Sequence, residues 1–489
     1  MWRRVALVGA LGVLAACSGD AEDSGATTTE APVSTAPAST AGTGPTTTPP
    51  PPVPVGAPTV GDPYVPAAGS GGFDVISYAV DVEIDPQLGR IDGTVVIEAV
   101  LTETVRAISF DIEPGIGQRW VQVDGRPVTT IPIDRGLEIV LPSVGDPGDE
   151  IEIEIAYFGL PEPLNGVVPF TDVGWSTETW GVVAASEPRG TATWMPVVDH
   201  PSDKATWEFW LTVPSPFEAV ASGRLVERID AGGGSTTFRW AVDDPMAPHA
   251  ALLLVADLEL VELDEVDGVE VTVAAPTATV PTVEASLADL PEMLDTFEGW
   301  FGPYPFGAFG IAVPPGRLGF AALETQELSL FDARALDVPG DAVVAHELAH
   351  MWFGNHVSPE RWEDIWLLEG LATYAEWLWF EASEGRPADV LADLYLDTAG
   401  PTQLLPPPGT PPIENLFVPA VYGRSALAFH DLRTRVGDEA FAELLQTWVE
   451  RFGGANGSTE DWFALVEEQV DAAAADRMRA WAFDDDPPS

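Results

Sequence analysis

Residues 343–350 place two histidines four positions apart, with a glutamate directly after the first of them. On an α-helix this spacing brings His346 and His350 to the same face, where both imidazoles can bind one metal ion. Glu347 adjoins the first histidine, and its carboxylate can instead accept a proton from water at an open position beside a zinc ion. The pattern therefore requires a helix here, and it predicts a zinc site that still lacks a third protein ligand.

His356 is one candidate for the third ligand, because it follows the first histidine at the ten-residue spacing found in metzincins. That pattern needs a glycine three residues after the second histidine, where this chain has Phe353, and the glycine comes one residue later as Gly354. It also needs a downstream methionine turn, yet residues 352–477 contain no methionine. These departures favour a role for His356 outside the set of zinc ligands.

Glu369 is the other candidate, on a helix predicted to begin near Glu363. The residues around it are apolar: Trp366, Leu367, Leu368, Leu371 and Ala372. A carboxylate in such surroundings is costly unless a cation pairs with it, and two histidines with one glutamate form a known catalytic zinc set. Glu376 lies two turns further along the same face, where it either accepts a hydrogen bond from a zinc-binding histidine or faces solvent.

The hydrophobic pattern divides the rest of the chain into two folded regions. Residues 71–258 contain runs in which apolar and polar residues alternate, separated by Gly, Pro and Asp, and these predict an all-β domain. The clearest runs cover residues 78–84, 151–157 and 207–213. From residue 259 to residue 489 the period becomes helical, beginning with apolar residues spaced from Leu287 to Phe301, with one strand-like stretch near residue 310.

The N-terminus carries export signals. Residues 1–16 combine two arginines with a short apolar run and predict a lipoprotein signal peptide, the alternative being an ordinary signal peptide. Cys17, the only cysteine, follows a Leu-Ala-Ala sequence that resembles a bacterial lipobox, so we expect it to carry the lipid. Residues 17–70 are rich in Thr, Pro and Ala and predict a disordered tether. The expected location is extracytoplasmic, at the bacterial cell membrane.

The charge of the chain excludes one class of partner. Acidic residues outnumber basic residues 77 to 22, which gives a formal net charge of −55. The phosphates of nucleic acids would repel such a chain, so no nucleic-acid partner is expected.

The segments HELAHMWFGN and WEDIWLLEGLATYAEW resemble the aminopeptidase N family of gluzincins, whose signature is HExxH, eighteen residues and Glu. Eighteen residues lie between His350 and Glu369, and the resemblance extends from about Phe73 to the end of the chain. It implies a saddle-like β-sandwich domain followed by a thermolysin-like α+β, mainly helical catalytic domain. It also implies one zinc ion, bound by His346, His350 and Glu369, and peptide substrates with a free N-terminus.

Two further segments resemble motifs that bind the substrate's N-terminus in this family. ALETQ, from Ala322, is similar to the GAMEN motif, which implies that Glu324 pairs with the substrate's amino group and that the backbone along Ala322 holds the peptide. Three side chains depart from the motif: Ala321, Leu323 and Thr325. Glu187 aligns with a second residue that contacts the amino terminus. It lies upstream of a stretch, beginning at Thr193, that is similar to the family's FPCxDEPxxKAxF.

VYGRSALAF, from Val421, is similar to the family's YxKGA segment. The resemblance implies that Tyr422 donates a hydrogen bond to the oxyanion, a role that suits a phenol that is neutral at pH 7. Arg424 stands where lysine is usual and keeps the positive charge.

The predicted function is therefore that of a zinc-dependent aminopeptidase, with Glu347 as the general base. Many relatives carry a long helical domain over the active site, and only 67 residues follow Tyr422 here, so we expect a short form without it. An open cleft would suit a thermolysin-like endopeptidase, which is one alternative. The other is a non-catalytic, peptide-binding surface lipoprotein, against which Glu347 and Tyr422 argue, because binding alone needs neither residue.

Overall fold

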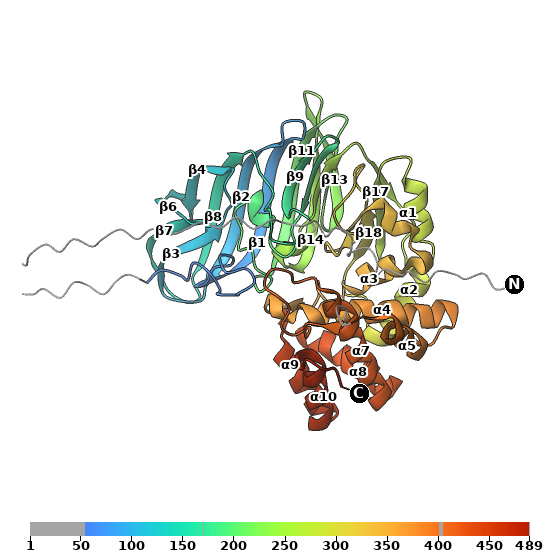
Figure 1. The fold of residues 1–489 in the computed structure, drawn as a ribbon. Helices are drawn as coiled ribbons and strands as arrows, with labels where there is room; N and C mark the ends of the chain where they lie inside the picture. Colours follow the sequence, from blue (N-terminus) through green and yellow to red (C-terminus); the bar gives the residue numbers. More distant parts are fainter. Residues whose placement is uncertain (1–53, 170, 401–403, 489) are drawn as a thin grey trace, which may run out of the picture.

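The computed structural model describes residues 54–169, 171–400 and 404–488. A β-rich N-terminal half, coloured blue to green, stands beside a C-terminal half whose helices are coloured yellow to red (Figure 1). The predicted order of an all-β domain followed by a mainly helical one is confirmed. The predicted signal peptide, Cys17 and most of the predicted tether lie outside the described residues.

The described strands of the N-terminal domain form three sheets. An eight-stranded sheet has the order β13-β14-β11-β1-β2-β8-β4-β5, and smaller sheets have the orders β12-β15-β10-β9 and β3-β7-β6. The strands are β1 (Phe73–Asp85), β2 (Arg90–Leu101), β3 (Val105–Asp111), β4 (Ile116–Val123), β5 (Arg126–Pro127), β6 (Thr130–Ile133), β7 (Gly136–Gly145), β8 (Glu150–Gly159), β9 (Gly174–Glu178), β10 (Gly181–Ala185), β11 (Ala205–Pro214), β12 (Glu218–Ala221), β13 (Arg224–Gly232), β14 (Ser235–Met246) and β15 (Leu253–Ala256).

The alternating runs in the sequence form the centre of the large sheet. Val80 of β1 lies beside Val95 of antiparallel β2 and beside Phe209 of parallel β11. All three side chains are fully buried in the core of the domain, while the polar residues between them face outward. The period of two in the sequence therefore encodes which face of the sheet packs inward.

The C-terminal domain begins with a second mixed sheet of the order β16-β17-β18-β20-β19. Its strands are β16 (Glu259–Glu262), β17 (Glu270–Ala275), β18 (Ala308–Ala312), β19 (Ala322–Leu323) and β20 (Ser329–Phe331). The helices are α1 (Val280–Ser286), α2 (Leu290–Phe301), α3 (Ala342–Ala349), α4 (Ile365–Glu384), α5 (Ala388–Thr398), α7 (Pro419–Val436), α8 (Asp438–Phe452), α9 (Thr459–Gln469) and α10 (Ala472–Phe483). Two short strands, β21 (Ser358–Pro359) and β22 (Asn456–Gly457), pair in parallel.

The helix predicted around Leu287 to Phe301 differs from the structure at its start. Leu287 lies in the turn that ends α1, and α2 begins at Leu290. Pro291 occupies the first turn of α2, where its missing N–H costs no helical hydrogen bond. The apolar spacing thus continues across a break between two helices, because both helices pack on the same core.

The end of the predicted tether is wrong, because residues 54–70 are packed against the folded domains. Val65 and Ala68 are buried, and Gly56 donates a backbone hydrogen bond to Ala107 at 2.9 Å. The buried carboxylate of Asp62 accepts a hydrogen bond from the backbone N–H of Trp362, at 2.9 Å, in the C-terminal domain. We refer to residues 54–70 as the strap.

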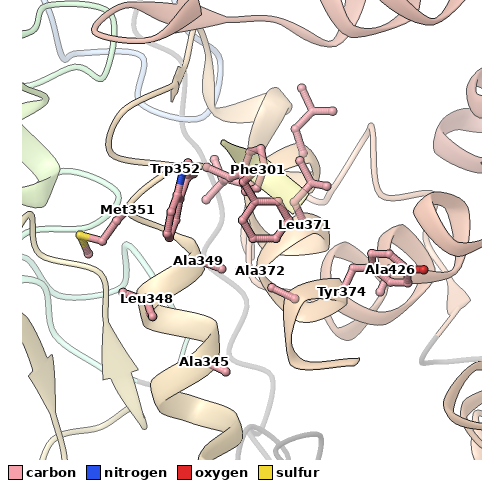
Figure 2. Packing of buried hydrophobic residues seen from close by; sticks show 14 of the residues in the cluster. Phe301, Ala345, Leu348, Ala349, Met351, Trp352, Leu371, Ala372, Tyr374 and Ala426 are labelled. Carbon is pink, nitrogen blue, oxygen red and sulfur yellow. The ribbon is translucent and has the colours of Figure 1, made fainter. Parts of the chain in front are cut away.

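The core of the C-terminal domain holds α3 and α4 together. Leu348 and Ala349 of α3 and Leu371 and Ala372 of α4 belong to one hydrophobic cluster (Figure 2). Small alanine side chains let the two helices approach closely. Among the described residues, no helix combines the length and the apolar character needed to cross a membrane.

Candidate active site

The two predicted histidine ligands lie at the C-terminal end of α3. His346 is in its last turn and His350 directly follows the helix, with 4.7 Å between the ring centroids. The helix ends at Ala349, so His350 is its C-terminal cap residue. Apolar residues on its other side anchor it in the core, so the ring positions are fixed by packing.

Glu369 lies on α4 and faces both histidines. Its Oε2 atom is 3.2 Å from Nε2 of His346 and 3.5 Å from Nε2 of His350. Burial raises the pKa of Glu369, but the hydrogen bonds with the two histidines outweigh it and lower the pKa to about 2. The carboxylate is therefore ionised, and it faces two ring nitrogens from one side.

The other nitrogen of each ring is already engaged. Nδ1 of His346 lies 2.9 Å from Oε1 of Glu376, and Nδ1 of His350 lies 2.9 Å from the carbonyl oxygen of Phe353. Both partners are acceptors, so each Nδ1 donates. In the neutral rings each Nε2 then carries a lone pair, which can bind a cation in place of its contact with Glu369. The sequence left two arrangements open for Glu376, a hydrogen bond with a zinc-binding histidine or exposure to solvent. The structure shows the hydrogen bond, with His346.

These residues fit a zinc ion. The ligand atoms of His346, His350 and Glu369 lie within 4.8 Å of one another. Two nitrogens and one carboxylate oxygen form a donor set that zinc prefers in catalytic sites, where a fourth position stays open. His356 belongs to neither group of described residues that could hold a metal ion, and its ring instead packs edge-on against Phe306 at 5.9 Å.

Three further glutamates surround the predicted metal position. Glu324, Glu347 and His350 form a second group whose polar atoms lie within 4.8 Å of one another. Burial raises the pKa of Glu347 to about 8 and also raises the pKa of Glu324. Burial, followed by the charges of Glu324 and Glu369, raises the pKa of Glu187 well above its usual range.

Each of these three carboxyl groups has one buried oxygen without a hydrogen-bond partner in the described structure: Oε1 of Glu187, Oε1 of Glu324 and Oε2 of Glu347. An unpartnered buried carboxylate is costly, and a cationic ligand or a proton can relieve that cost. The site therefore has the chemistry to receive positive charge beyond that of one metal ion.

Tyr422 completes the site from α7. Its ring stacks near that of His346, with 6.2 Å between centroids. Burial, together with the charges of Glu369, Glu187 and Glu324, raises its pKa well above the usual value. The phenol is therefore neutral and can act as a hydrogen-bond donor.

Ala322 lies in β19, which forms one edge of the five-stranded sheet. An edge strand has one row of unpaired backbone groups, to which an extended peptide can add. Glu324 directly follows this strand. The structure thus brings together the predicted site residues Glu187, Glu324, His346, Glu347, His350, Glu369, Glu376 and Tyr422, and it places Ala322 on the sheet edge two residues before Glu324.

Comparisons with known proteins also indicate a peptidase. The model of the peptidase M1 N-terminal domain matches residues 75–248, and that of the peptidase family M1 domain matches residues 335–481. Aminopeptidase M1-A of Oryza sativa subsp. japonica is 29% identical over 61% of this chain, and puromycin-sensitive aminopeptidase of Caenorhabditis elegans is 24% identical over 82%. The chain covers only 36% and 46% of the length of these relatives.

Among solved structures, the M1 zinc metallopeptidase of Deinococcus radiodurans is 32% identical, with a TM-score of 0.81. The match covers 88% of this chain and 99% of that one. A mutant of the same protein has been solved with a bound Tyr-Ser-Ala substrate, and this structure is 33% identical to the chain with a TM-score of 0.80.

Proposed function

The chain belongs to peptidase family M1, and on that basis we propose that it is a zinc-dependent aminopeptidase that removes N-terminal residues from peptides. The observation that carries this proposal is the set of unpartnered carboxylate oxygens beside the zinc ligands. A peptide's α-amino group is a cation with three donors, and it would pair with Glu324 and Glu187. An endopeptidase has no use for such a pair, since its substrates present no charged amine at the cleavage position.

The peptide backbone would extend along β19. The neighbouring M1 metallopeptidase structure with a bound Tyr-Ser-Ala substrate supports a peptide ligand for this fold. With its amino group at Glu324, a peptide places its first carbonyl group near His346 and His350, because Glu324 and His350 lie in one cluster.

The residues of the chain divide the reaction between them. When bound, zinc supplies a Lewis acid that polarises the carbonyl group and makes water more acidic. Glu347, whose ionised form the charge of a bound zinc ion would favour, accepts the proton of the attacking water and passes it to the nitrogen of the leaving amine as the peptide bond breaks. Tyr422 donates a hydrogen bond to the carbonyl oxygen as its negative charge develops.

The proposal is tested with a panel of aminoacyl chromogenic substrates, assayed with and without a chelator. We expect release of the chromophore from free aminoacyl substrates, loss of activity with the chelator and recovery on adding zinc. Glu347→Gln is the matched control, because it keeps the size of the side chain and all three zinc ligands. It should bind zinc but lose activity by a factor of about 10²–10⁴. Undiminished activity in this variant would contradict the proposal.

We also propose that the enzyme acts outside the cytoplasm, attached to the membrane by lipid on Cys17. The N-terminal sequence alone supports this step. Cells expressing the full chain should incorporate a labelled fatty acid into the protein, and a Cys17→Ser variant should not. Equal labelling of both proteins would contradict lipidation at Cys17 without affecting the proposed peptidase activity.

A further inference from the structure

Asn355 is a buried polar residue that connects two parts of the site. It lies five residues after His350, and its own backbone N–H donates to the carbonyl oxygen of His350 at 3.0 Å. Its side-chain Nδ2 donates to the carbonyl oxygen of Glu324 at 2.7 Å. Only 1% of Asn355 is exposed to solvent, so water does not replace either contact.

The Glu324 carbonyl group lies just beyond the strand pairing. β19 ends at Leu323, which pairs with Leu330 of β20, and the ladder goes no further. The Asn355 amide therefore takes the place of a strand partner for the backbone of Glu324. The Glu324 side chain extends from this stretch of backbone. The hydrogen bond therefore sets the position of the side chain relative to the end of α3.

Asn355 is itself held from the other domain. Nζ of Lys204, directly before β11, donates to the carbonyl oxygens of Asn355 at 2.7 Å and His356 at 2.9 Å, and more weakly to Ala455 at 3.4 Å. Lys204 is half-buried, and the burial of its amino group lowers its pKa to about 7. The carbonyl oxygens replace the hydration that this amino group loses.

We propose that Asn355, held in place by Lys204 of the β domain, is a positioning residue that sets the substrate-binding carboxylate of Glu324 against the zinc-binding end of α3. The inference rests on the proposed function, because it assigns a purpose to the position of Glu324. The β domain thereby takes part in recognising the peptide's amino terminus without touching the peptide.

The test compares KM, kcat and zinc content of the wild type and Asn355→Ala on an aminoacyl chromogenic substrate. The substitution removes the side-chain donor and keeps the backbone N–H on His350. We expect KM to rise about 10-fold, kcat to change less than about 3-fold and zinc content to be unchanged, because only the group that holds the amine is displaced. The matched control is Ser358→Ala, which perturbs the same buried turn through Gly354 and Asn355 without contacting Glu324.

Two further comparisons separate positioning from loss of stability. In a Glu324→Gln background, Asn355→Ala should raise KM no further, because both changes act on one interaction. Lys204→Met should raise KM as Asn355→Ala does, and Lys204→Arg, which keeps the donors, should largely restore it. If Asn355→Ala does not fold, this Lys204 pair decides the matter.

An unchanged KM in a folded, zinc-loaded Asn355→Ala or Lys204→Met protein would overturn the inference, as would equal effects of Asn355→Ala in both backgrounds. A wild type that does not release N-terminal residues, or a Glu324→Gln variant with the wild-type KM, would instead overturn the proposed function.

Discussion

At the scale of single residues, the site is defined by a surplus of buried carboxylates. Glu369 is ionised between two histidines, whereas burial raises the pKa of Glu187, Glu324 and Glu347. A zinc ion satisfies the first carboxylate directly. Glu187, Glu324 and Glu347 each still have an unpartnered oxygen. Such oxygens can bind the amino group of a substrate or accept a proton during the reaction.

The choice between the two candidates for the third ligand can be measured by zinc content after dialysis. Glu369→Ala should weaken zinc binding by more than about 100-fold, because it removes a ligand rather than an outer hydrogen bond. His356→Ala should retain the metal, because the His356 ring lies outside the ligand group. Loss of zinc from His356→Ala, or a full zinc complement in Glu369→Ala, would contradict the assignment.

Tyr422→Phe removes one hydroxyl group and leaves the ring that stacks near His346. Because the phenol acts on charge that develops only during the reaction, kcat should fall about 10²–10³-fold while KM changes little. Steady-state kinetics on a single aminoacyl substrate give both values. A change confined to KM would mean that Tyr422 binds the substrate rather than stabilising the oxyanion.

The sequence was informative about these residues where spacing along one or two helices determines geometry. The separations of His346, His350 and Glu369 are fixed by helical periodicity and a short connection. The role of Asn355 could not be predicted in this way, because its partner Glu324 lies 31 residues earlier and contacts it only in the tertiary fold.

At the scale of elements, strands were predicted better than helix ends. Alternating burial along β1, β8 and β11 follows directly from their residues, because one face of each strand meets the core. The end of α3 could not be predicted from a local pattern of this kind. After Ala349 the chain turns, and residues distant in the sequence hold the turn: Lys204 donates to the carbonyl oxygen of Asn355, whose side chain donates to the carbonyl oxygen of Glu324.

Asp111, the last residue of β3, links that strand to two other segments. Its Oδ2 accepts backbone hydrogen bonds from Gly69 and Asp199, both at 2.8 Å. Burial raises its pKa to about 7, with a smaller contribution from the charge of Asp199. A carboxyl group with a raised pKa binds its proton more tightly in the folded state. Its contribution to stability is therefore full below its unfolded pKa of about 3.9 and is lost as pH rises through about 7.

The midpoint of thermal unfolding should therefore fall between pH 5 and pH 8 by more in the wild type than in Asp111→Asn, which stays neutral and keeps an acceptor. Each 1 kcal/mol of this contribution corresponds to roughly 2–4 °C in a chain of this class. Thermal scans of both proteins at the two pH values measure the difference. Parallel pH dependence in the two proteins would show that Asp111 does not titrate as described.

At the scale of the whole molecule, the strap is the segment for which composition gives the wrong prediction. Residues 54–70 share the low hydrophobicity of the preceding segment, so the sequence predicts disorder. Their order depends on a few specific contacts instead. The carboxylate of Asp62 accepts a hydrogen bond from the backbone N–H of Trp362. The hydroxyl group of Tyr64 donates one to the carbonyl oxygen of Pro411 at 2.9 Å.

Two truncations separate the strap from the segment before it. Removing residues 1–53 should leave the unfolding midpoint and kcat/KM of the purified protein unchanged. Removing residues 1–70 should lower the midpoint by several degrees, because the backbone N–H of Trp362 and the region around Asp111 lose buried partners. Equal midpoints for the two truncated proteins would show that the strap adds nothing to stability.

The central claim is that the site reads a free amino terminus, and one pair of peptides tests it most directly. The kcat/KM of the purified zinc-loaded protein is measured for a tripeptide with a free α-amino group and for the same peptide with that group acetylated. Acetylation removes the cation and leaves Glu324 buried without a partner, so we predict a loss of at least about 100-fold. Equal kcat/KM for the two peptides would contradict the aminopeptidase account and favour an endopeptidase.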